Sequence, residues 1–235
     1  MSLSYEREDI ANAYIERIKD LVSGKRTMPE VKYQFSRAID EIHASDLDGL
    51  CMWKVYFRRT VCDAPEISND AALKFLRGRV IERAIGTEQE PIERDGIILT
   101  IDDIHPLYGM TEIKSVMKDS SKFDPLDAKA GYPHWITRIK AYCYANDVDR
   151  MNLVVYFLVG NMWIKKTKSV DLKAWELRFA KDELAENWAK LLDRRDALVA
   201  AFKAGEPPPA TYAAKESWEC KGCEMSVGCP KFNTY

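Results

Sequence analysis

The 235-residue sequence contains no apolar run long enough to span a membrane, and its first residues, MSLSYEREDI, contain no apolar targeting segment. It also lacks an excess of charge, because 35 lysines and arginines balance 37 aspartates and glutamates to a formal net charge of −2. This balance argues against a protein that binds polyanions over its whole surface, but it is compatible with a local basic groove. There is no internal repeat and no long low-complexity tract. We therefore expect an intracellular, cytoplasmic protein without a membrane partner.

The composition is that of a globular chain, with 46% hydrophobic and 31% charged residues. Its length allows one large domain or two small ones, each with a proper hydrophobic core. The one stretch typical of a linker is Gly205-Glu206-Pro207-Pro208-Pro209, near the C-terminus.

C-terminal to this linker, three cysteines lie within a span of ten residues, as Cys220-x2-Cys223-x5-Cys229-Pro230. Thiols this close cannot all pair with one another as unstrained disulfides, and a reducing cytosol disfavours disulfides. A shared metal site explains the spacing better, and both zinc and an iron–sulfur cluster fit it. Either centre normally takes four ligands, so the fourth must come from elsewhere in the chain.

Two hydrophobic periods alternate along the sequence and predict an α/β fold. Apolar residues recur at helical spacing in some segments, whereas a two-residue alternation or a short continuous apolar run marks others as strands. The predicted helices are 6–22, 50–59, 71–85, 135–145 and 182–202, and the predicted strands are 96–104, 111–117, 153–159 and 163–170.

Acidic and basic residues occur together in the first two predicted strands. Asp102 lies near the end of the first strand, while Glu112 and Lys114 share one face of the second. If these strands are neighbours, two mutually repelling carboxylates converge, and Mg²⁺ or Mn²⁺ would relieve the repulsion while accepting a phosphate oxygen. The lysine can orient an attacking water or stabilise charge on a pentavalent phosphate. The pattern therefore predicts phosphodiester hydrolysis, although exposed hairpins also carry such residues as solvated ion pairs.

The segment from Leu99 to Lys114 resembles the core of the PD-(D/E)xK nuclease superfamily, in which an aspartate at a strand end precedes Glu-x-Lys on the next strand. The resemblance implies that Asp102, Glu112 and Lys114 are catalytic. It also implies that Mg²⁺ or Mn²⁺ is bound by Asp102, Glu112 and the carbonyl of Ile113.

An upstream helical segment resembles the first motif of RecB-like nucleases, Gly-x-x-x-His-Glu. Here the motif begins at Gly78, and Glu82 stands where that branch has histidine. The resemblance implies that Glu82 is a further metal ligand, although the additional negative charge departs from the family pattern. The alternative is an exposed ion pair with Arg79 or Arg83.

A downstream segment resembles the Gln-x-x-x-Tyr motif of the same nucleases. Arg138 replaces the glutamine, and Tyr142 follows one helical turn later on the same face. The resemblance implies that both residues bind DNA, with Arg138 on a substrate phosphate. The alternatives are an ion pair of Arg138 with Asp147 or another neighbour, and a half-buried Tyr142.

The segment from Ser45 to Arg59 resembles the N-terminal signature of an iron–sulfur branch of RecB-like nucleases, which includes the fourth CRISPR-associated (Cas) protein family. The resemblance covers roughly residues 45–230 and implies a [4Fe–4S] cluster with one N-terminal and three C-terminal cysteines. Its ligands would be Cys51, Cys220, Cys223 and Cys229. Cys62 competes with Cys51 for the fourth position, whereas Cys143 is expected to be a buried small hydrophobe. A zinc site remains the alternative.

The resemblance implies a restriction-endonuclease-like fold, with a mixed central sheet flanked by helices and a small iron–sulfur subdomain. We expect an N-terminal helical segment at 1–68, a nuclease core at 69–204 and a cysteine tail at 205–235. The expected activity is exonucleolytic, on single-stranded DNA ends, with CRISPR adaptation proteins or recombination proteins as partners. A catalytically degenerate protein that binds DNA ends or a partner protein is the alternative.

Overall fold

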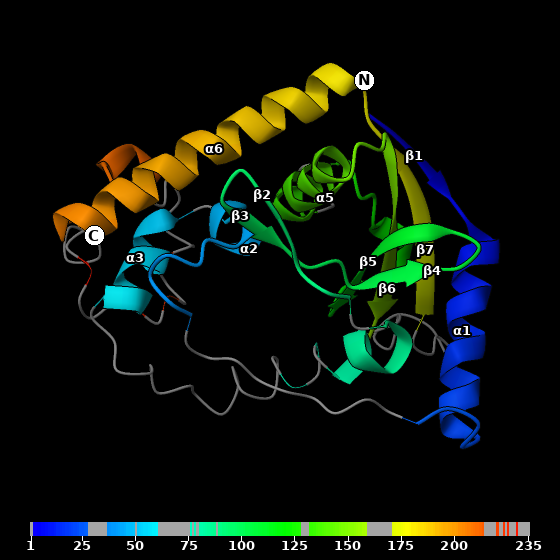
Figure 1. The fold of residues 1–235 in the computed structure, drawn as a ribbon. Helices are drawn as coiled ribbons and strands as arrows, with labels where there is room; N and C mark the ends of the chain where they lie inside the picture. Colours follow the sequence, from blue (N-terminus) through cyan, green and yellow to red (C-terminus); the bar gives the residue numbers. More distant parts are fainter. Residues whose placement is uncertain are drawn as a thin grey trace.

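Helices cover both faces of a mixed five-stranded sheet, so the α/β class expected from the sequence is confirmed (Figure 1). The computed structural model describes residues 2–27, 37–49, 51–60, 76, 78, 80–87, 89–127, 132–158, 171–213, 220, 223, 225 and 229. Over these residues, no helix is both long enough and apolar enough to cross a membrane. The iron–sulfur subdomain stays a prediction.

The central sheet has the strand order β1-β7-β6-β5-β4, in which β5 and β6 run parallel and the other neighbours are antiparallel. Strand β6 is paired on both sides and buried along most of its length, which explains its continuous apolar sequence. The strands of this sheet are β1 (Leu3–Glu6), β4 (Asp103–His105), β5 (Gly109–Val116), β6 (Arg150–Phe157) and β7 (Asp171–Arg178), and a separate hairpin contains β2 (Ile92–Arg94) and β3 (Ile97–Leu99).

The single strand predicted at 96–104 is in fact two short strands separated by a bend. Strand β3 pairs with β2 through a tight turn at Asp95–Gly96, where both residues have positive φ. The chain then bends at residues 100–102 and continues as β4, which pairs with β5. The apolar alternation continues through the bend because Ile101 is buried, so the sequence pattern does not reveal the break. Asp102 therefore lies at the bend, directly before β4.

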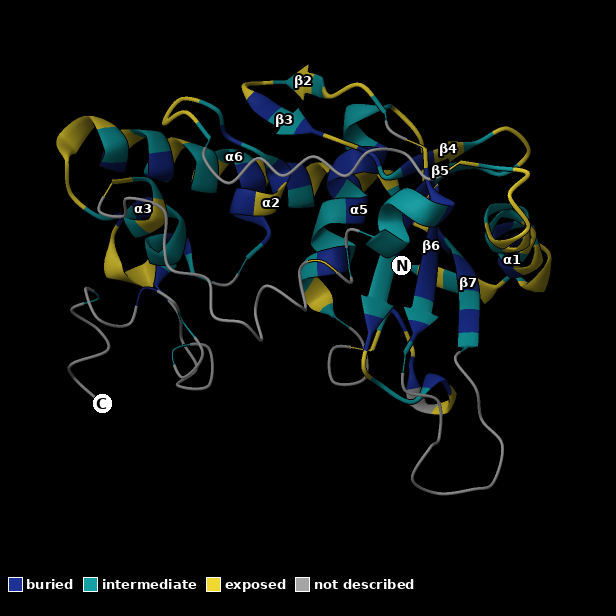
Figure 2. Ribbon diagram, turned by 90° about the horizontal axis from the view of Figure 1, so that it is seen from below, coloured by how far each residue is buried: buried dark blue, intermediate teal, exposed yellow. Residues whose placement is uncertain are grey.

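Two hydrophobic cores lie on the two faces of the sheet. Helix α1 and the helical residues 80–85 pack on one face, around Tyr14 and Ile113. Helices α2, α3, α5 and α6, with the β2-β3 hairpin, enclose the other core, which includes Leu153 and Trp188. Figure 2 shows buried residues along β6 and the inner sides of the helices. The helices are α1 (Glu8–Val22), α2 (Ala44–Leu47), α3 (Met52–Thr60), α5 (Pro133–Ala145) and α6 (Lys181–Ala204), with 3-10 turns η1 (Ser120–Lys122) and η2 (Ala210–Tyr212).

Residues 3–22 pack on the central sheet, within the segment 1–68 that the sequence analysis set apart, and the division into domains stays a prediction. Strand β1 pairs with β7 at the sheet edge, and α1 packs on the sheet. Strand β1 was not predicted because its four residues are mostly exposed and carry no clear apolar alternation. The strand predicted at 163–170 lies outside the described residues, and β7 follows it.

Candidate active site

The bend before β4 places Asp102 beside β5. Strands β4 and β5 pair Asp103 with Thr111, so residue 102 is held next to the middle of β5. The Asp102 Oδ2 atom accepts a hydrogen bond from the backbone N–H of Ile113 at 2.8 Å and one from Lys114 Nζ at 3.2 Å. The structure therefore brings together the residues that the sequence analysis predicted to be catalytic.

Glu112 is fully buried, with 0% relative exposure. Its Oε1 lies 2.6 Å from Lys114 Nζ and 3.6 Å from a terminal nitrogen of Arg138, but neither carboxylate oxygen accepts an aligned hydrogen bond from a described residue. Burial raises the pKa of Glu112 to about 7, and the negative charge of Asp102 acts in the same direction. Lys114 and Arg138 oppose this shift.

Lys114 is the cation at the centre of the site. Its Nζ donates to the carbonyl oxygen of Ile113 at 2.9 Å and to Asp102, and it forms the close ion pair with Glu112. Burial alone would lower the pKa of Lys114, but the carboxylates of Asp102, Glu112 and Glu82 raise it above its ordinary value. The ammonium is therefore charged at every physiological pH.

The geometry fits the divalent cation that the sequence analysis expected. The oxygens predicted to bind it, from Asp102, Glu112 and Ile113, surround one small volume, and a hard-oxygen donor set suits Mg²⁺ or Mn²⁺. Across the described part of the chain, no group of three or more His, Cys, Asp or Glu residues is placed to hold a metal. The site would therefore combine two carboxylates, one carbonyl and water, as Mg²⁺ commonly does.

The helix carrying Glu82 is packed tightly against the site through Gly86. A Cβ atom at Gly86 would lie 2.7 Å from the Asp102 carbonyl oxygen and 2.8 Å from that of Glu82, and 3.0 Å from Ile113 Cδ1. Glycine is thus required for the close approach. The negative charge of Glu82 is one of the causes that raise the pKa of Lys114, so this carboxylate belongs to the electrostatic surroundings of the site. A role of Glu82 as a metal ligand stays a prediction.

A buried hydrogen-bond network around Asp103, which the sequence analysis did not predict, holds the chain directly after the bend. Asp103 is fully buried and accepts hydrogen bonds from Tyr14, Arg17 and Thr87 at 2.5–2.6 Å. Arg17 also donates to the carbonyl of Ile85, so it links α1 to the end of the Glu82 helix. The sequence did contain a signal for this network. Asp103 directly follows Asp102, and successive side chains of an extended segment point to opposite faces, so Asp103 would be expected to face away from the proposed metal site.

Arg138 is held by Asp48, a residue to which the sequence analysis gave no role. Arg138 Nε lies 2.5 Å from Asp48 Oδ2, and the two side chains are 21% and 3% exposed. Asp147, the partner considered from the sequence, instead pairs with Arg94. Arg138 thus joins the segment before Cys51 to the catalytic strand. Its contact with DNA stays a prediction.

Tyr142 is buried beneath the bend, with 4% relative exposure. Its hydroxyl donates to the carbonyl of Thr100 at 2.9 Å, immediately before the turn into β4. Burial raises the pKa of Tyr142 well above its usual range. In this arrangement the Tyr142 side chain helps to hold the chain just before Asp102, and its contact with DNA stays a prediction.

The described cysteines are in the thiol form and none is in a disulfide. Cys51 precedes α3, and Trp53 donates its indole N–H to the carbonyl of Pro208 at 2.6 Å, which brings α3 next to the predicted linker. Cys143 is buried, and burial raises its pKa to about 12, as expected of an inert thiol. Cys62 lies outside the described residues. A metal or iron–sulfur centre shared by Cys51 and the tail cysteines stays a prediction.

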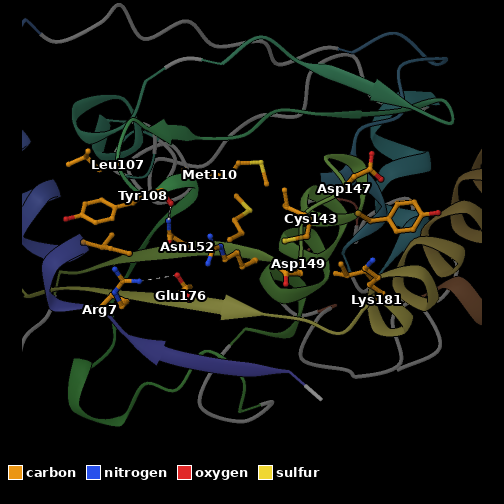
Figure 3. A pocket seen from close by; sticks show the side chains of 17 residues that line it. Arg7, Leu107, Tyr108, Met110, Cys143, Asp147, Asp149, Asn152, Glu176 and Lys181 are labelled. Carbon is orange, nitrogen blue, oxygen red and sulfur yellow. Dashed lines mark hydrogen bonds and ion pairs between the residues drawn. The ribbon is translucent and has the colours of Figure 1, made fainter.

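A separate pocket of about 1160 Å³ opens where β5 and β6 begin (Figure 3). Its lining does not include the predicted catalytic residues. Basic side chains there face acidic ones, and Arg7 is already paired with Glu176 at 3.1 Å. The balanced charge gives this pocket no preference for a polyanion such as DNA.

Comparisons with known proteins find only weak structural similarity, to solved structures that include two described by name. No protein-family model matches the chain, and no curated protein matches it. The crystal structure of SSO0001 aligns over 94% of this chain and 96% of its own, with 16% identity and a TM-score of 0.47. An alkaline exonuclease from Laribacter hongkongensis aligns over 73% of this chain and 95% of its own, with 14% identity and a TM-score of 0.43. At these scores, the functional assignment has to come from the residues of the site.

Proposed function

We propose that the protein is a metal-dependent DNA nuclease that removes nucleotides from single-stranded ends. The observation that carries this proposal is the fully buried Glu112, whose oxygens lack aligned hydrogen bonds and lie beside Asp102 and Lys114. Structural ion pairs rarely leave a buried carboxylate in this state, whereas perturbed carboxylates are concentrated at functional sites. Two carboxylates can hold a divalent cation at a phosphate, and a neighbouring lysine can stabilise the developing charge, which are the groups that metal-dependent phosphodiester hydrolysis can use.

Each residue of the site has a distinct part in this proposal. Asp102, Glu112 and the carbonyl of Ile113 would hold Mg²⁺ or Mn²⁺, with Glu82 as a further ligand. When bound, the cation supplies positive charge at the phosphate being attacked. Lys114 provides a mobile ammonium that can orient the attacking water or balance charge on the phosphate oxygens.

We also propose that Cys51, Cys220, Cys223 and Cys229 bind a [4Fe–4S] cluster. The support is the cysteine spacing together with the hydrogen bond from Trp53 to Pro208, which holds the linker of the tail against α3. Such a centre would be structural, because it joins segments from both ends of the chain. Zinc bound to the same thiols is the competing assignment.

The biological setting follows from the resemblance seen in the sequence. A nuclease of the iron–sulfur RecB-like kind would trim DNA ends in CRISPR spacer acquisition or in recombination. Its partners would then be the other proteins of that process.

The direct test is digestion of end-labelled single-stranded and duplex DNA with Mn²⁺ or Mg²⁺, with and without a chelator. We expect degradation of single strands that requires the metal. Asp102→Ala and Lys114→Ala should each lower the rate by at least about a hundredfold, since each removes a group acting at the reacting phosphate. Asp147→Ala, in an exposed ion pair, is the matched control and should retain full activity. Full Mn²⁺-dependent activity in the first two variants would contradict the proposal.

A degenerate protein that binds DNA ends is the second candidate. Two observations favour it: glutamate replaces the expected histidine at position 82, and Arg138 is engaged by Asp48 rather than exposed toward a groove. This candidate predicts retention of labelled single strands in a gel-shift assay without any loss of label, with or without Mn²⁺.

A further inference from the structure

We propose that the Lys114 ammonium occupies the position of the divalent cation in the metal-free protein and is displaced when the metal binds. This inference rests on the proposed function, because it concerns the same carboxylates. It adds that a single side chain both keeps the site assembled without metal and limits the affinity for metal.

The contacts of Lys114 match the ligand set expected for the metal. Its Nζ lies 2.6 Å from Glu112 Oε1, 2.9 Å from the Ile113 carbonyl oxygen and 3.2 Å from Asp102 Oδ2. An ammonium has three N–H donors and no acceptor, and here three oxygens surround it. A divalent ion could not reach the same oxygens at about 2.1 Å while the ammonium stayed among them.

The charges of the neighbouring residues explain why an internal cation is needed. Glu112 is fully buried, so its negative charge requires a cation beside it. Arg138 approaches Glu112 only to 3.6 Å, and its Nε is bound to Asp48. Of the two described cations that pair with Glu112, Lys114 is therefore the closer and neutralises it more directly when no metal is present.

Displacement would also put Lys114 where catalysis needs it. The ammonium is carried on a flexible four-carbon chain, and the Lys114 side chain as a whole is 12% exposed, so a short movement would take the ammonium from the oxygens to the rim of the site. It would remain beside the metal ligands because Lys114 lies two residues from Glu112 on the same face of β5. Metal binding and release of the lysine toward the phosphate would thus be one event.

The test is the affinity for Mn²⁺, measured from the electron paramagnetic resonance signal of free Mn²⁺ in titrations of the full-length protein without DNA. Lys114→Gln removes the charge at similar length, and Lys114→Arg retains a positive charge. Lys173→Gln is the matched control, since Lys173 forms a 3.2 Å ion pair with Glu6 on the far edge of the sheet. We expect Lys114→Gln to bind Mn²⁺ about tenfold more tightly or better, while Lys173→Gln binds like the wild type. Lys114→Arg should bind no more tightly than the wild type.

Denaturant unfolding separates displacement from simple charge repulsion. If Lys114 acts as a cation substitute, metal-free Lys114→Gln unfolds at lower denaturant than the wild type, and the two proteins unfold together when saturated with Mn²⁺. If Lys114 only repels the bound metal, the metal-free proteins unfold together and the saturated variant is the more stable. Should Lys114→Gln be unfolded without metal, recovery of its circular dichroism by Mn²⁺ supports displacement, and failure to recover contradicts it.

Equal or weaker Mn²⁺ binding by Lys114→Gln would overturn this inference and leave the proposed function intact. Failure of the wild type to bind Mn²⁺ at all would instead overturn the proposed function.

Discussion

At the scale of single residues, the neighbours of Glu112 could be predicted from the sequence, whereas its burial is known only from the structure. Its proximity to Asp102 and Lys114 follows from strand periodicity, because alternate residues of β5 share a face. Its complete burial does not follow from local sequence, since it depends on residues distant in the chain, such as Arg138 and Tyr142 of α5. Burial is nevertheless the property that makes this carboxylate chemically special.

The raised pKa of Glu112 predicts how metal binding depends on pH. The folded metal-free protein binds the Glu112 proton more tightly than the unfolded chain does, so this group stabilises the fold below its ordinary pKa of 4.5. That stability, on the order of 3 kcal/mol, is lost as pH rises through about 7. Mn²⁺ has to replace the proton, so its stabilising effect should be small near pH 6 and large near pH 8.

Melting curves with and without Mn²⁺ at these two pH values measure the effect. Glu112→Gln, which cannot ionise, should show little stabilisation by Mn²⁺ at either pH. An equal Mn²⁺-induced shift for the wild type near pH 6 and near pH 8 would argue against a protonated Glu112.

The close packing at Gly86 leads to a second prediction for a single residue. A methyl group there would collide with the backbone of Asp102 and of Glu82, so Gly86→Ala should cost about 1–3 kcal/mol of unfolding free energy and weaken Mn²⁺ binding by separating the two elements. Gly49→Ala is the control, since a Cβ at Gly49 meets no atom within 4 Å. Chemical denaturation and Mn²⁺ titration of both variants provide the comparison. Unchanged metal affinity in Gly86→Ala would show that the contact does not position the site.

At the scale of elements, the helices and the parallel pair of strands were predictable, whereas short or bent elements were not. The continuous apolar run of β6 and the helical period of α5 and α6 lie close to their observed bounds. Strand β1 is too short and too exposed for a periodic signal, and the break between β3 and β4 is hidden because Ile101 is buried within it. These misses are tertiary effects, in which pairing with a distant strand overrides a weak local pattern.

The ion pair between Asp48 and Arg138 couples the segment after α2 to α5. Asp48 is almost completely buried, so Asp48→Ala should leave the Arg138 guanidinium with only its longer 3.6 Å ion pair to Glu112 and cost about 3–5 kcal/mol of unfolding free energy. The exposed pair of Asp147 with Arg94 is the control, and Asp147→Asn, which removes the charge and suits the positive φ of residue 147, should cost less than about 1 kcal/mol. The double variant Asp48→Ala/Arg138→Met should recover part of the loss in urea unfolding, because no charge is then left unpaired. A similar cost for both single variants would contradict a buried coupling.

At the scale of the whole molecule, the fold places the N-terminal segment and the start of the C-terminal tail together. Arg194 of α6 donates to the carbonyl of Gly49, and Trp53 donates to Pro208, so the region around Cys51 is fixed on both sides. The spacing of the tail cysteines was visible in the sequence. Which distant cysteine completes the set depends on this tertiary arrangement and could not be derived from spacing.

If Cys51 completes a cluster, the protein purified without oxygen should contain about four irons and four sulfides per chain. Cys51→Ser should lose most of this iron, and its melting temperature should fall because the two ends are released. Cys143→Ser tests a buried thiol outside the set and should keep its iron. Stoichiometric zinc in place of iron and sulfide would favour the zinc assignment.

The central claim is that Asp102, Glu112 and Ile113 bind a divalent cation in the position now held by Lys114. Anomalous diffraction from a crystal soaked in Mn²⁺ tests it most directly. The account predicts one strong peak about 2.1 Å from an oxygen of each of these residues, with the Lys114 ammonium moved away. The absence of a peak there, at Mn²⁺ concentrations that support DNA cleavage, would contradict it.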